Sequence, residues 1–173
     1  MLIEVMNEDL VIDELKSQRK EEVIKEIASK FKEAGVVKDE NKLIESIWER
    51  ERIESTAIGG SIAIPHAHSD TVEKLAVAFA RSEKGVDFDS LDRKPVHLIF
   101  MIASPPHIKK EYLQVLARIA RLCKNEKIKE ALLKAKNKYE ILGYIKGFDI
   151  GSGKLEEIKL KDGRTIFPNK RSN

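Results

Sequence analysis

"PVHLIFMIAS", residues 95–104, decides the fold of this chain. The run is apolar almost throughout and rich in β-branched and aromatic side chains, which is typical of a β-strand. A strand with one solvent-exposed face would alternate between apolar and polar residues, and this stretch does not. It therefore predicts a central strand that is covered on both faces of its sheet.

The segments on either side predict further strands and the helices that cover them. "LAVAFARS" (75–82) has another strand pattern, and shorter strands are expected within residues 8–15 and at residues 61–65. Apolar residues at helical spacing predict helices at about residues 20–34, 39–52 and 110–124, and after Asn125 and Asn137. Strands and helices interleaved in this way predict an α/β fold, a three-layer sandwich in which a mixed β-sheet carries helices on both faces.

The chain length of 173 residues suits one domain, which we place at residues 1–150. From Gly151 onward the pattern changes, and "KLEEIKLKDGRTIFP" predicts two short strands about an Asp162-Gly163 turn. We therefore expect residues 151–173 to be a tail with a β-hairpin, appended to the domain rather than part of its core.

Composition argues against several classes of protein. The net charge of +3 comes from 32 basic and 29 acidic residues that are mixed along the chain, so a nucleic-acid partner is not expected. No apolar run reaches membrane-spanning length and the first residues do not resemble a signal peptide, so any link to a membrane would be indirect, through a transporter partner. The single cysteine, Cys123, cannot form an internal disulfide, which favours a cytoplasmic location.

The stretch "STAIGGSIAIPHAH", residues 55–68, holds the residues most suited to chemistry. One interpretation is structural: the glycines turn the chain, Thr56 satisfies local backbone groups, and His66 is incidental. The other is a site. Because Pro65 favours a strand end, His66 would lie at the carboxyl end of a strand, where ligands collect in open α/β sheets.

The residues around His66 fit an anion. The backbone amides of Gly59 and Gly60 can form an anion-binding concavity, and the hydroxyl of Thr56 is a further donor. Arg50, expected in the last turn of the preceding helix, could bind phosphate in a bidentate manner. An imidazole, a hydroxyl, amides and a guanidinium together describe a site for a phosphoryl group on or beside a histidine.

The whole run from Arg50 to Ala67, "REriESTaIGGsIAIPHa", resembles the active-site signature of the type-2 enzyme IIA domains of the phosphoenolpyruvate:sugar phosphotransferase system. These include the fructose/mannitol class and its nitrogen-regulatory relatives. The residues that match the pattern in order are Arg50, Glu51, Ser55, Thr56, Ile58, Gly59, Ile62, Ala63, Ile64, Pro65 and His66. The resemblance covers about residues 5–147.

The resemblance implies a phosphoryl carrier without a cofactor or metal. His66 would accept the phosphoryl group from phospho-HPr and pass it to a cysteine of an enzyme IIB. The alternative is a regulatory IIA protein whose phosphorylation state selects a protein target, which the absence of a fused IIB or membrane component in this chain favours. The partner surface is expected around His66, with exposed apolar residues such as Ile58 or Ile62.

Two positions depart from the family pattern. Ala57 replaces the usual first glycine. Family members also carry a second histidine at the start of the long helix, where this chain has Tyr112. The Tyr112 hydroxyl could bind the phosphoryl group in its place, His107 could swing in, or transfer could be slow or lost. A tyrosine that packs on Leu116 is the structural alternative.

The remaining candidates have weaker support. Glu51 could orient Arg50 or an imidazole, or be a surface carboxylate, and Ser55 belongs to the matched signature. His68 could pair with His66 on a metal, but no third ligand is apparent. Cys123 is expected to pack in a helical seam rather than react.

Overall fold

The protein forms a mixed five-stranded β-sheet in a computed structural model that describes residues 1–151 and 157–166. The strands are β1 (Val11–Ile12), β2 (Ile62–Ala63), β3 (His66–His68), β4 (Ala76–Val86) and β5 (Val96–Ser104). Their order is β1-β4-β5-β2, and β3 also pairs with β5. The β4–β5 pair is antiparallel and the other pairs are parallel, so residues 95–104 form the central strand, as predicted.

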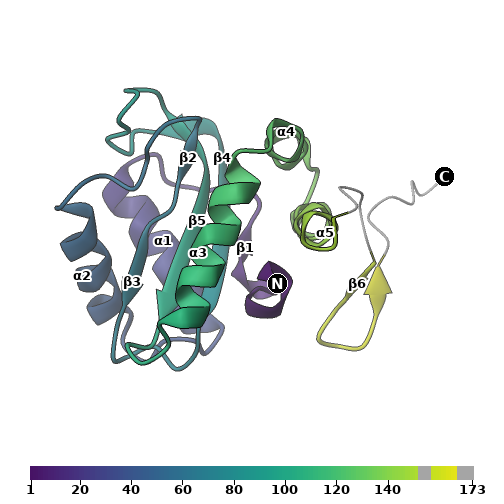
Figure 1. Ribbon diagram of the computed structural model, residues 1–173, viewed down its shortest axis with the longest axis horizontal. Helices are drawn as coiled ribbons and strands as arrows, with labels where there is room; N and C mark the ends of the chain where they lie inside the picture. The colour runs from purple at the N-terminus through teal and green to yellow at the C-terminus, as the bar shows by residue number, and fades with distance from the viewer. Residues whose placement is uncertain (152–156, 167–173) are drawn as a thin grey trace.

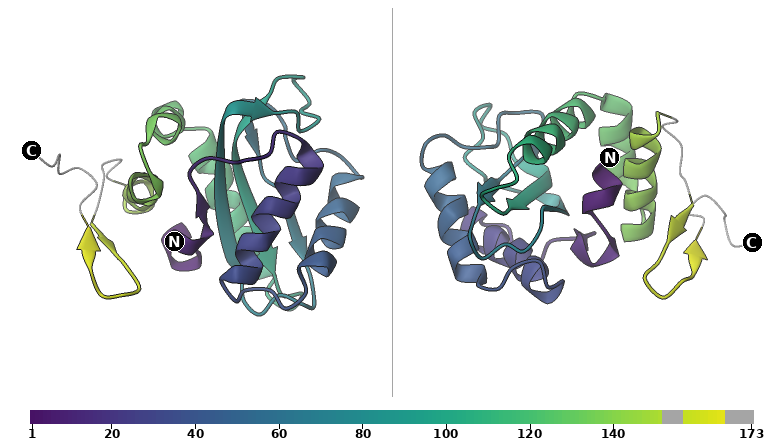
Figure 2. Two further views of the ribbon diagram at one scale, coloured as in Figure 1. Left: turned by 180° about the vertical axis from the view of Figure 1, so that it is seen from behind. Right: turned by 60° about the horizontal axis from the view of Figure 1, so that its bottom comes forward.

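Helices cover both faces of this sheet (Figures 1 and 2). The described helices are η1 (Leu2–Val5), η2 (Glu8–Leu10), α1 (Lys20–Glu33), α2 (Glu40–Glu51), α3 (Lys110–Cys123), α4 (Glu126–Lys134) and α5 (Lys138–Asp149). In the view from behind, α1 lies across the sheet, whereas α3 lies on the opposite face. The predicted three-layer α/β architecture is therefore confirmed.

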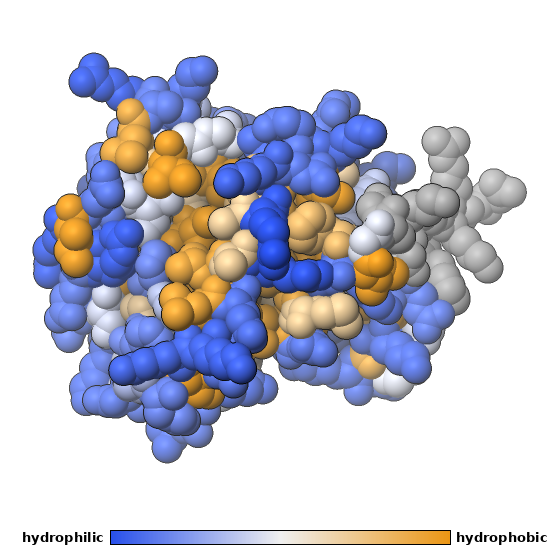
Figure 3. Space-filling view, viewed as in Figure 1, coloured by the Kyte–Doolittle hydropathy of each residue, from blue (hydrophilic) through white to orange (hydrophobic). Residues whose placement is uncertain are grey.

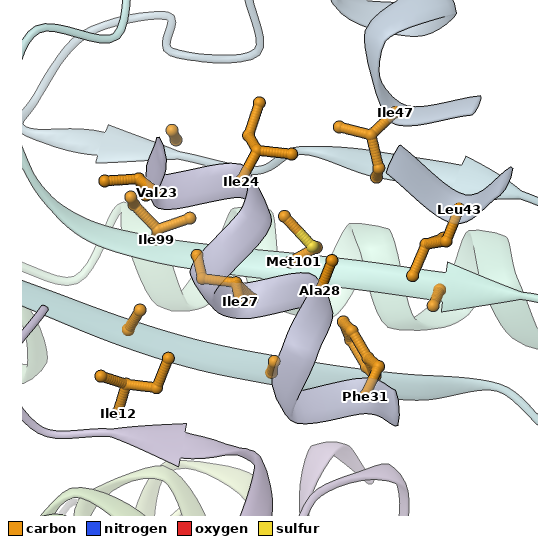
Figure 4. Packing of buried hydrophobic residues seen from close by; sticks show 14 of the residues in the cluster. Ile12, Val23, Ile24, Ile27, Ala28, Phe31, Leu43, Ile47, Ile99 and Met101 are labelled. Atoms are coloured by element: carbon orange, nitrogen blue, oxygen red, sulfur yellow. The ribbon is translucent and has the colours of Figure 1, made fainter. Parts of the chain in front are cut away.

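Side chains that alternate along β5 divide the core into two clusters. Ile99 and Met101 face α1 and α2, where they join the apolar stripe of α1 (Figure 4). Leu98 and Phe100 belong to the cluster that also contains buried residues of α3, α4 and α5. The Phe100 ring meets Phe79 of β4 edge to face at 5.0 Å between centroids. A continuous apolar strand is required because both of its faces are buried.

Side-chain caps explain where several helices begin. Asp39 accepts hydrogen bonds from the backbone N–H groups of Asn41 and Lys42 at the start of α2. Asn125 and Asn137 cap α4 and α5 in the same way, which satisfies amides that have no partner within the helix. The helix starts expected at these positions are confirmed.

The strand expected at residues 61–65 is different in the structure. It is divided into β2 and β3, with Ile64 and Pro65 between them, and pairing with β5 resumes at His66. Pro65 has no N–H to donate, but its carbonyl oxygen accepts the N–H of Ile102 at 3.0 Å. His66 therefore begins a short strand rather than following the end of one. The strand expected within residues 8–15 is likewise reduced to β1, preceded by η2.

The C-terminal segment forms a hairpin that contributes to the core. β6 (Ile158–Lys159) and β7 (Thr165–Ile166) are antiparallel, as predicted around the Asp162-Gly163 turn. Ile158 and Leu160 are buried within the cluster that also contains α5. The expectation that this tail lies outside the core is wrong for these two side chains, while the parts of the tail at residues 152–156 and 167–173 lie outside the described residues.

Within residues 1–151 and 157–166, every helix is too short or too polar to cross a membrane.

Candidate active site

His66 is a half-buried imidazole on the edge strand β3. Its Nδ1–H donates to the carbonyl oxygen of Ile64 at 2.7 Å, because a carbonyl oxygen can only accept. This bond selects the tautomer in which Nε2 keeps its lone pair. Burial lowers the pKa of His66, the bond to Ile64 raises it, Arg50 lowers it and Glu51 raises it. The net shift is downward, which favours a neutral, nucleophilic ring at neutral pH.

Arg50 extends from the last turn of α2, and its charge acts on the His66 imidazole. One of its terminal nitrogens donates to the Glu54 carbonyl oxygen at 2.8 Å, which leaves its other N–H groups for a ligand. Its charge acts in the same direction as burial on the pKa of His66, which is lowered, and opposes the larger effect of burial on the pKa of Tyr112, which is raised. Arg50 therefore lies within electrostatic reach of both side chains, as a binding role for an anion requires.

Tyr112 reaches the site from the first turn of α3. Its ring centroid is 6.1 Å from that of His66 and 4.2 Å from that of His68. Burial raises the pKa of Tyr112 to about 12, so the hydroxyl keeps its proton at neutral pH and can donate a hydrogen bond. Tyr112 thus faces the histidine as the sequence comparison with the family suggested.

His68 is an exposed second imidazole that packs against Tyr112. Its Nδ1 lies 3.3 Å from the Pro105 carbonyl oxygen. His66 and His68 both contact Tyr112, while Ala67 between them is buried on the opposite face with α1 and α2. In the described part of the chain, no group of three or more His, Cys, Asp or Glu side chains is placed to bind a metal ion.

Thr56 is buried and bound to Glu51. Its backbone N–H donates to the Glu51 carboxylate at 3.2 Å, and its hydroxyl donates to the other carboxylate oxygen. Both donors are therefore used within the protein, so Thr56 shapes the loop rather than presenting a free hydroxyl. Ser55 connects the same loop to the segment after β4, since its hydroxyl donates to the Phe88 carbonyl oxygen at 2.8 Å.

Gly59 and Gly60 lie at the other end of the edge strand. Both have a positive φ, and the Gly60 amide donates to the Asp92 carboxylate at 3.2 Å. They precede β2, where Ile62 pairs with Leu98, whereas His66 pairs with Ile102. Four strand residues separate those positions by about 13 Å. The structure therefore does not bring the two glycine amides to His66.

His107 is exposed in the loop between β5 and α3. It lines a groove of about 940 Å³ with η1 and α3, together with Met1 and Arg118, and Tyr112 does not line this groove. Of these two side chains, Tyr112 is the one with a ring contact to His66 among the described residues. Cys123 packs against the α3–α5 cluster, and burial raises the pKa of its thiol to about 12, which suits a packing residue.

Three large apolar side chains of α3 and of the segment between α2 and β2 are exposed. Ile53, Ile58 and Leu113 are largely exposed, whereas Ile62 is buried at 4% exposure. Apolar surface gathers along and beside α3 on the face in Figure 3. Of the two isoleucines expected at a partner surface, only Ile58 is therefore available.

One residue of this region could not be inferred from the local sequence. Lys20 begins α1, and its ammonium lies 2.9 Å from the Glu51 carboxylate. It is far from Glu51 in the sequence, and only the packing of α1 against α2 brings the two together.

Known proteins with similar sequences carry the same kind of domain. Residues 4–147 match the family described as "Phosphoenolpyruvate-dependent sugar phosphotransferase system, EIIA 2". The chain is 41% identical to the fructose-specific EIIA component of Haloferax volcanii, over 63% of this chain and 71% of that protein. It is 37% identical to the fructose-specific EIIABC component of Bacillus subtilis over 86% of this chain, but spans only 23% of that longer protein.

Solved structures agree with this match. The nitrogen regulatory protein IIA-Ntr of Neisseria meningitidis superposes with a TM-score of 0.76 at 27% identity, covering 81% of this chain and 95% of that one. The mannitol IIA of Escherichia coli, solved in complex with phosphorylated IIB, has the same fold, with a TM-score of 0.68 at 24% identity over 79% of this chain and 94% of that one. The chain belongs to the EIIA type-2 family of the phosphoenolpyruvate-dependent sugar phosphotransferase system and is a phosphoryl-transfer protein.

Proposed function

We propose that His66 accepts a phosphoryl group from phospho-HPr and passes it to a cysteine of an enzyme IIB. The observation that carries this proposal is the 2.7 Å bond from Nδ1–H of His66 to the Ile64 carbonyl oxygen. It leaves the Nε2 lone pair as the nucleophile, in a half-buried ring whose centroid is 6.1 Å from that of Tyr112 and on which the charge of Arg50 acts.

The chemistry requires positioning and charge stabilisation. The Nε2 lone pair forms a bond to phosphorus while the bond to the donor breaks, and that electron pair leaves with the donor. Arg50 stabilises the negative oxygens of the phosphoryl group, and the protonated Tyr112 hydroxyl donates a hydrogen bond to one of them. In the second transfer, a thiolate forms the new bond to phosphorus and the Nε2 lone pair is restored.

The proteins similar to this chain indicate which classes of protein its partners would belong to. Fructose-specific EIIA components are among the relatives, and the mannitol IIA of E. coli forms a complex with phosphorylated IIB. Leu113, exposed next to Tyr112 on α3, would provide apolar contact area for a protein that approaches His66, and exposed Ile58 would belong to that surface only if the partner also covers the glycine turn. The same surface would serve donor and acceptor in turn.

The direct test is incubation with phosphoenolpyruvate, enzyme I and HPr, followed by intact mass measurement. We expect one acid-labile phosphoryl adduct on the wild type and none on His66→Ala. His68→Ala is the matched control, because it removes the neighbouring imidazole and should still be phosphorylated. An adduct that survives His66→Ala, or none on the wild type, overturns the carrier mechanism.

A regulatory role is the second candidate, because IIA-Ntr of N. meningitidis matches over nearly its whole length. In that case the phosphorylated and unphosphorylated forms would differ in affinity for a protein target. Transfer from phospho-His66 to a fructose-class IIB separates the two roles. Rapid loss of the adduct to the IIB cysteine supports the carrier, and a stable adduct in its presence supports the regulator.

A further inference from the structure

Lys20 is a nearly buried cation whose partner belongs to the candidate site. Its Nζ lies 2.9 Å from the Glu51 carboxylate, and the side-chain exposures are 10% for Lys20 and 1% for Glu51. The exposed Asp89 lies on the same ammonium at 3.4 Å. The rings of Trp48 and Phe88 flank it, with centroids 5.5 and 4.8 Å away. These contacts hold the ammonium in one place.

Glu51 connects the Lys20 ammonium to the loop that precedes β2. Its two carboxylate oxygens accept the hydroxyl and the backbone N–H of Thr56. Charge-assisted bonds of this kind are stronger than neutral ones. A buried carboxylate without its cation would be uncompensated, so Lys20 is required for Glu51 to hold Thr56 in this way.

Thr56 is in turn linked to His66 through the backbone. Its carbonyl oxygen accepts the N–H of Ile64 at 3.3 Å, and the Ile64 carbonyl oxygen accepts Nδ1–H of His66 at 2.7 Å. A continuous set of contacts therefore runs from α1 to the imidazole, through Lys20, Glu51, Thr56 and Ile64. Its last bond is the one that selects the His66 tautomer.

We propose that Lys20 is a positioning residue of the phosphoryl site, which acts through Glu51 and Thr56 to keep His66 in the tautomer with a free Nε2. This inference rests on the function proposed for His66, but the tautomer can be measured without any phosphoryl transfer. Lys20 touches neither the imidazole nor the phosphoryl group in this scheme. Its role is to keep the loop and the Ile64 carbonyl in place.

The experiment compares Lys20→Met, Glu51→Gln, the double variant and Lys20→Arg with the wild type. Nitrogen-15 NMR of the ring reports the tautomer of His66, and rapid mixing with phospho-HPr reports the maximal rate and the half-saturating concentration. We expect Lys20→Met to show a mixture of tautomers and a maximal rate lowered about tenfold, with little change in half-saturation. Lys20→Arg keeps the charge and should behave as the wild type.

The double variant tests whether Lys20 acts through Glu51. We expect it to resemble Glu51→Gln alone, because residues of one network have non-additive effects. It also removes the buried charge, so it remains informative if Lys20→Met fails to fold. Ile27→Val, a core substitution in the same helix, controls for a loss of stability alone and should leave the tautomer unchanged.

Two results would overturn the proposal. One is a Lys20→Met protein that keeps the pure Nδ1–H tautomer and the wild-type rate. The other is a double variant whose rate loss equals the product of the two single losses, since Lys20 would then act elsewhere. If the wild type forms no adduct at all, the proposed function fails instead, and the tautomer measurement still decides the role of Lys20.

Discussion

The two ends of the stretch Gly59–His68 differ in their surroundings, although only five residues separate Gly60 from His66. At one end, Gly59 and Gly60 form a turn with positive φ that is tied to Asp92. At the other end, the tautomer of His66 is set by Ile64, its ring faces Tyr112, and the charge of Arg50 acts on it. The first end forms a tight turn of the backbone, whereas the second places an imidazole where nearby charges act on it.

This difference shows that residues which are close together in a sequence motif can lie far apart in the folded protein. The rise along an extended strand is about 3.3 Å per residue, so a few residues are enough to separate two side chains by more than 10 Å along the edge of the sheet. The glycines therefore serve the entry into β2, while the chemistry proposed for His66 would use residues from α2 and α3. Substitutions at the two ends should separate stability from phosphoryl transfer.

Arg50→Ala should give the largest effect, confined to the histidine end. Loss of a guanidinium that stabilises the phosphoryl oxygens should lower the phosphorylation rate by about 100-fold. Rapid mixing with phospho-HPr measures it. Arg52→Ala is the matched control, because Arg52 is exposed at the C-cap of the same helix. Equal losses in both variants would show that the charge of the helix end, rather than Arg50, matters.

Gly59→Ala should act at the turn end and on stability. Gly59 has φ of 128°, and an added Cβ would lie 3.2 Å from the Asp92 carboxylate. The strained backbone should lower the free energy of unfolding by about 2 kcal/mol. Urea titration measures this loss, while the phosphorylation rate of the folded protein should stay unchanged. A slowed transfer at full folding would place the glycine turn in the site after all.

Tyr112→Phe should have a smaller effect at the histidine end. Removal of one hydrogen bond to a charged phosphoryl oxygen should slow phosphorylation by about tenfold. Tyr139→Phe, on α5, provides a matched control that lacks only a remote hydroxyl. If Tyr112→Phe is as fast as the wild type, Tyr112 is a packing residue, and a rate increase in Tyr112→His would identify what the family's histidine supplies.

The pH dependence of stability should show the smallest effect. Burial is the main cause of the lowered pKa of His66, so protonation is less favourable in the folded than in the unfolded chain. The penalty is absent at high pH, appears as the pH falls below about 6.5, and is complete below the folded pKa. Urea titrations from pH 8 to 5 should therefore show wild type losing stability relative to His66→Gln. A constant difference across this range would contradict the lowered pKa.

Much of the fold could be predicted because its signals are local. The continuous apolar run of β5 predicted a doubly covered strand, and Asp39, Asn125 and Asn137 predicted helix starts. The division between β2 and β3 does not follow from the local pattern, because a proline favours a strand end. In the tertiary structure, Pro65 instead contributes its carbonyl oxygen to β5.

The sequence predicted part of the candidate site. The contacts that it did not predict join residues that are far apart in the sequence and meet only in the folded protein. The candidate residues around His66 come from separate elements: Arg50 was predicted because it matches the family pattern, and Tyr112 because it stands where family members carry a second histidine. Nothing in the pattern assigned the Glu51 carboxylate to Lys20, because that pair requires α1 to pack on α2. The ring contact between His68 and Tyr112 likewise depends on how α3 lies against β3.

The sequence by itself determined the class of fold, the approximate starts of several helices, the family and the identity of the candidate phosphoryl acceptor. These properties follow from periodicity, turn residues and an ordered motif, all of which are local. Only the tertiary structure decided that the glycine turn lies away from His66, that Thr56 donates to Glu51, and that Lys20 completes the contacts. Strand register and helix packing set those relations, and both arise from burial of the two apolar faces of the sheet.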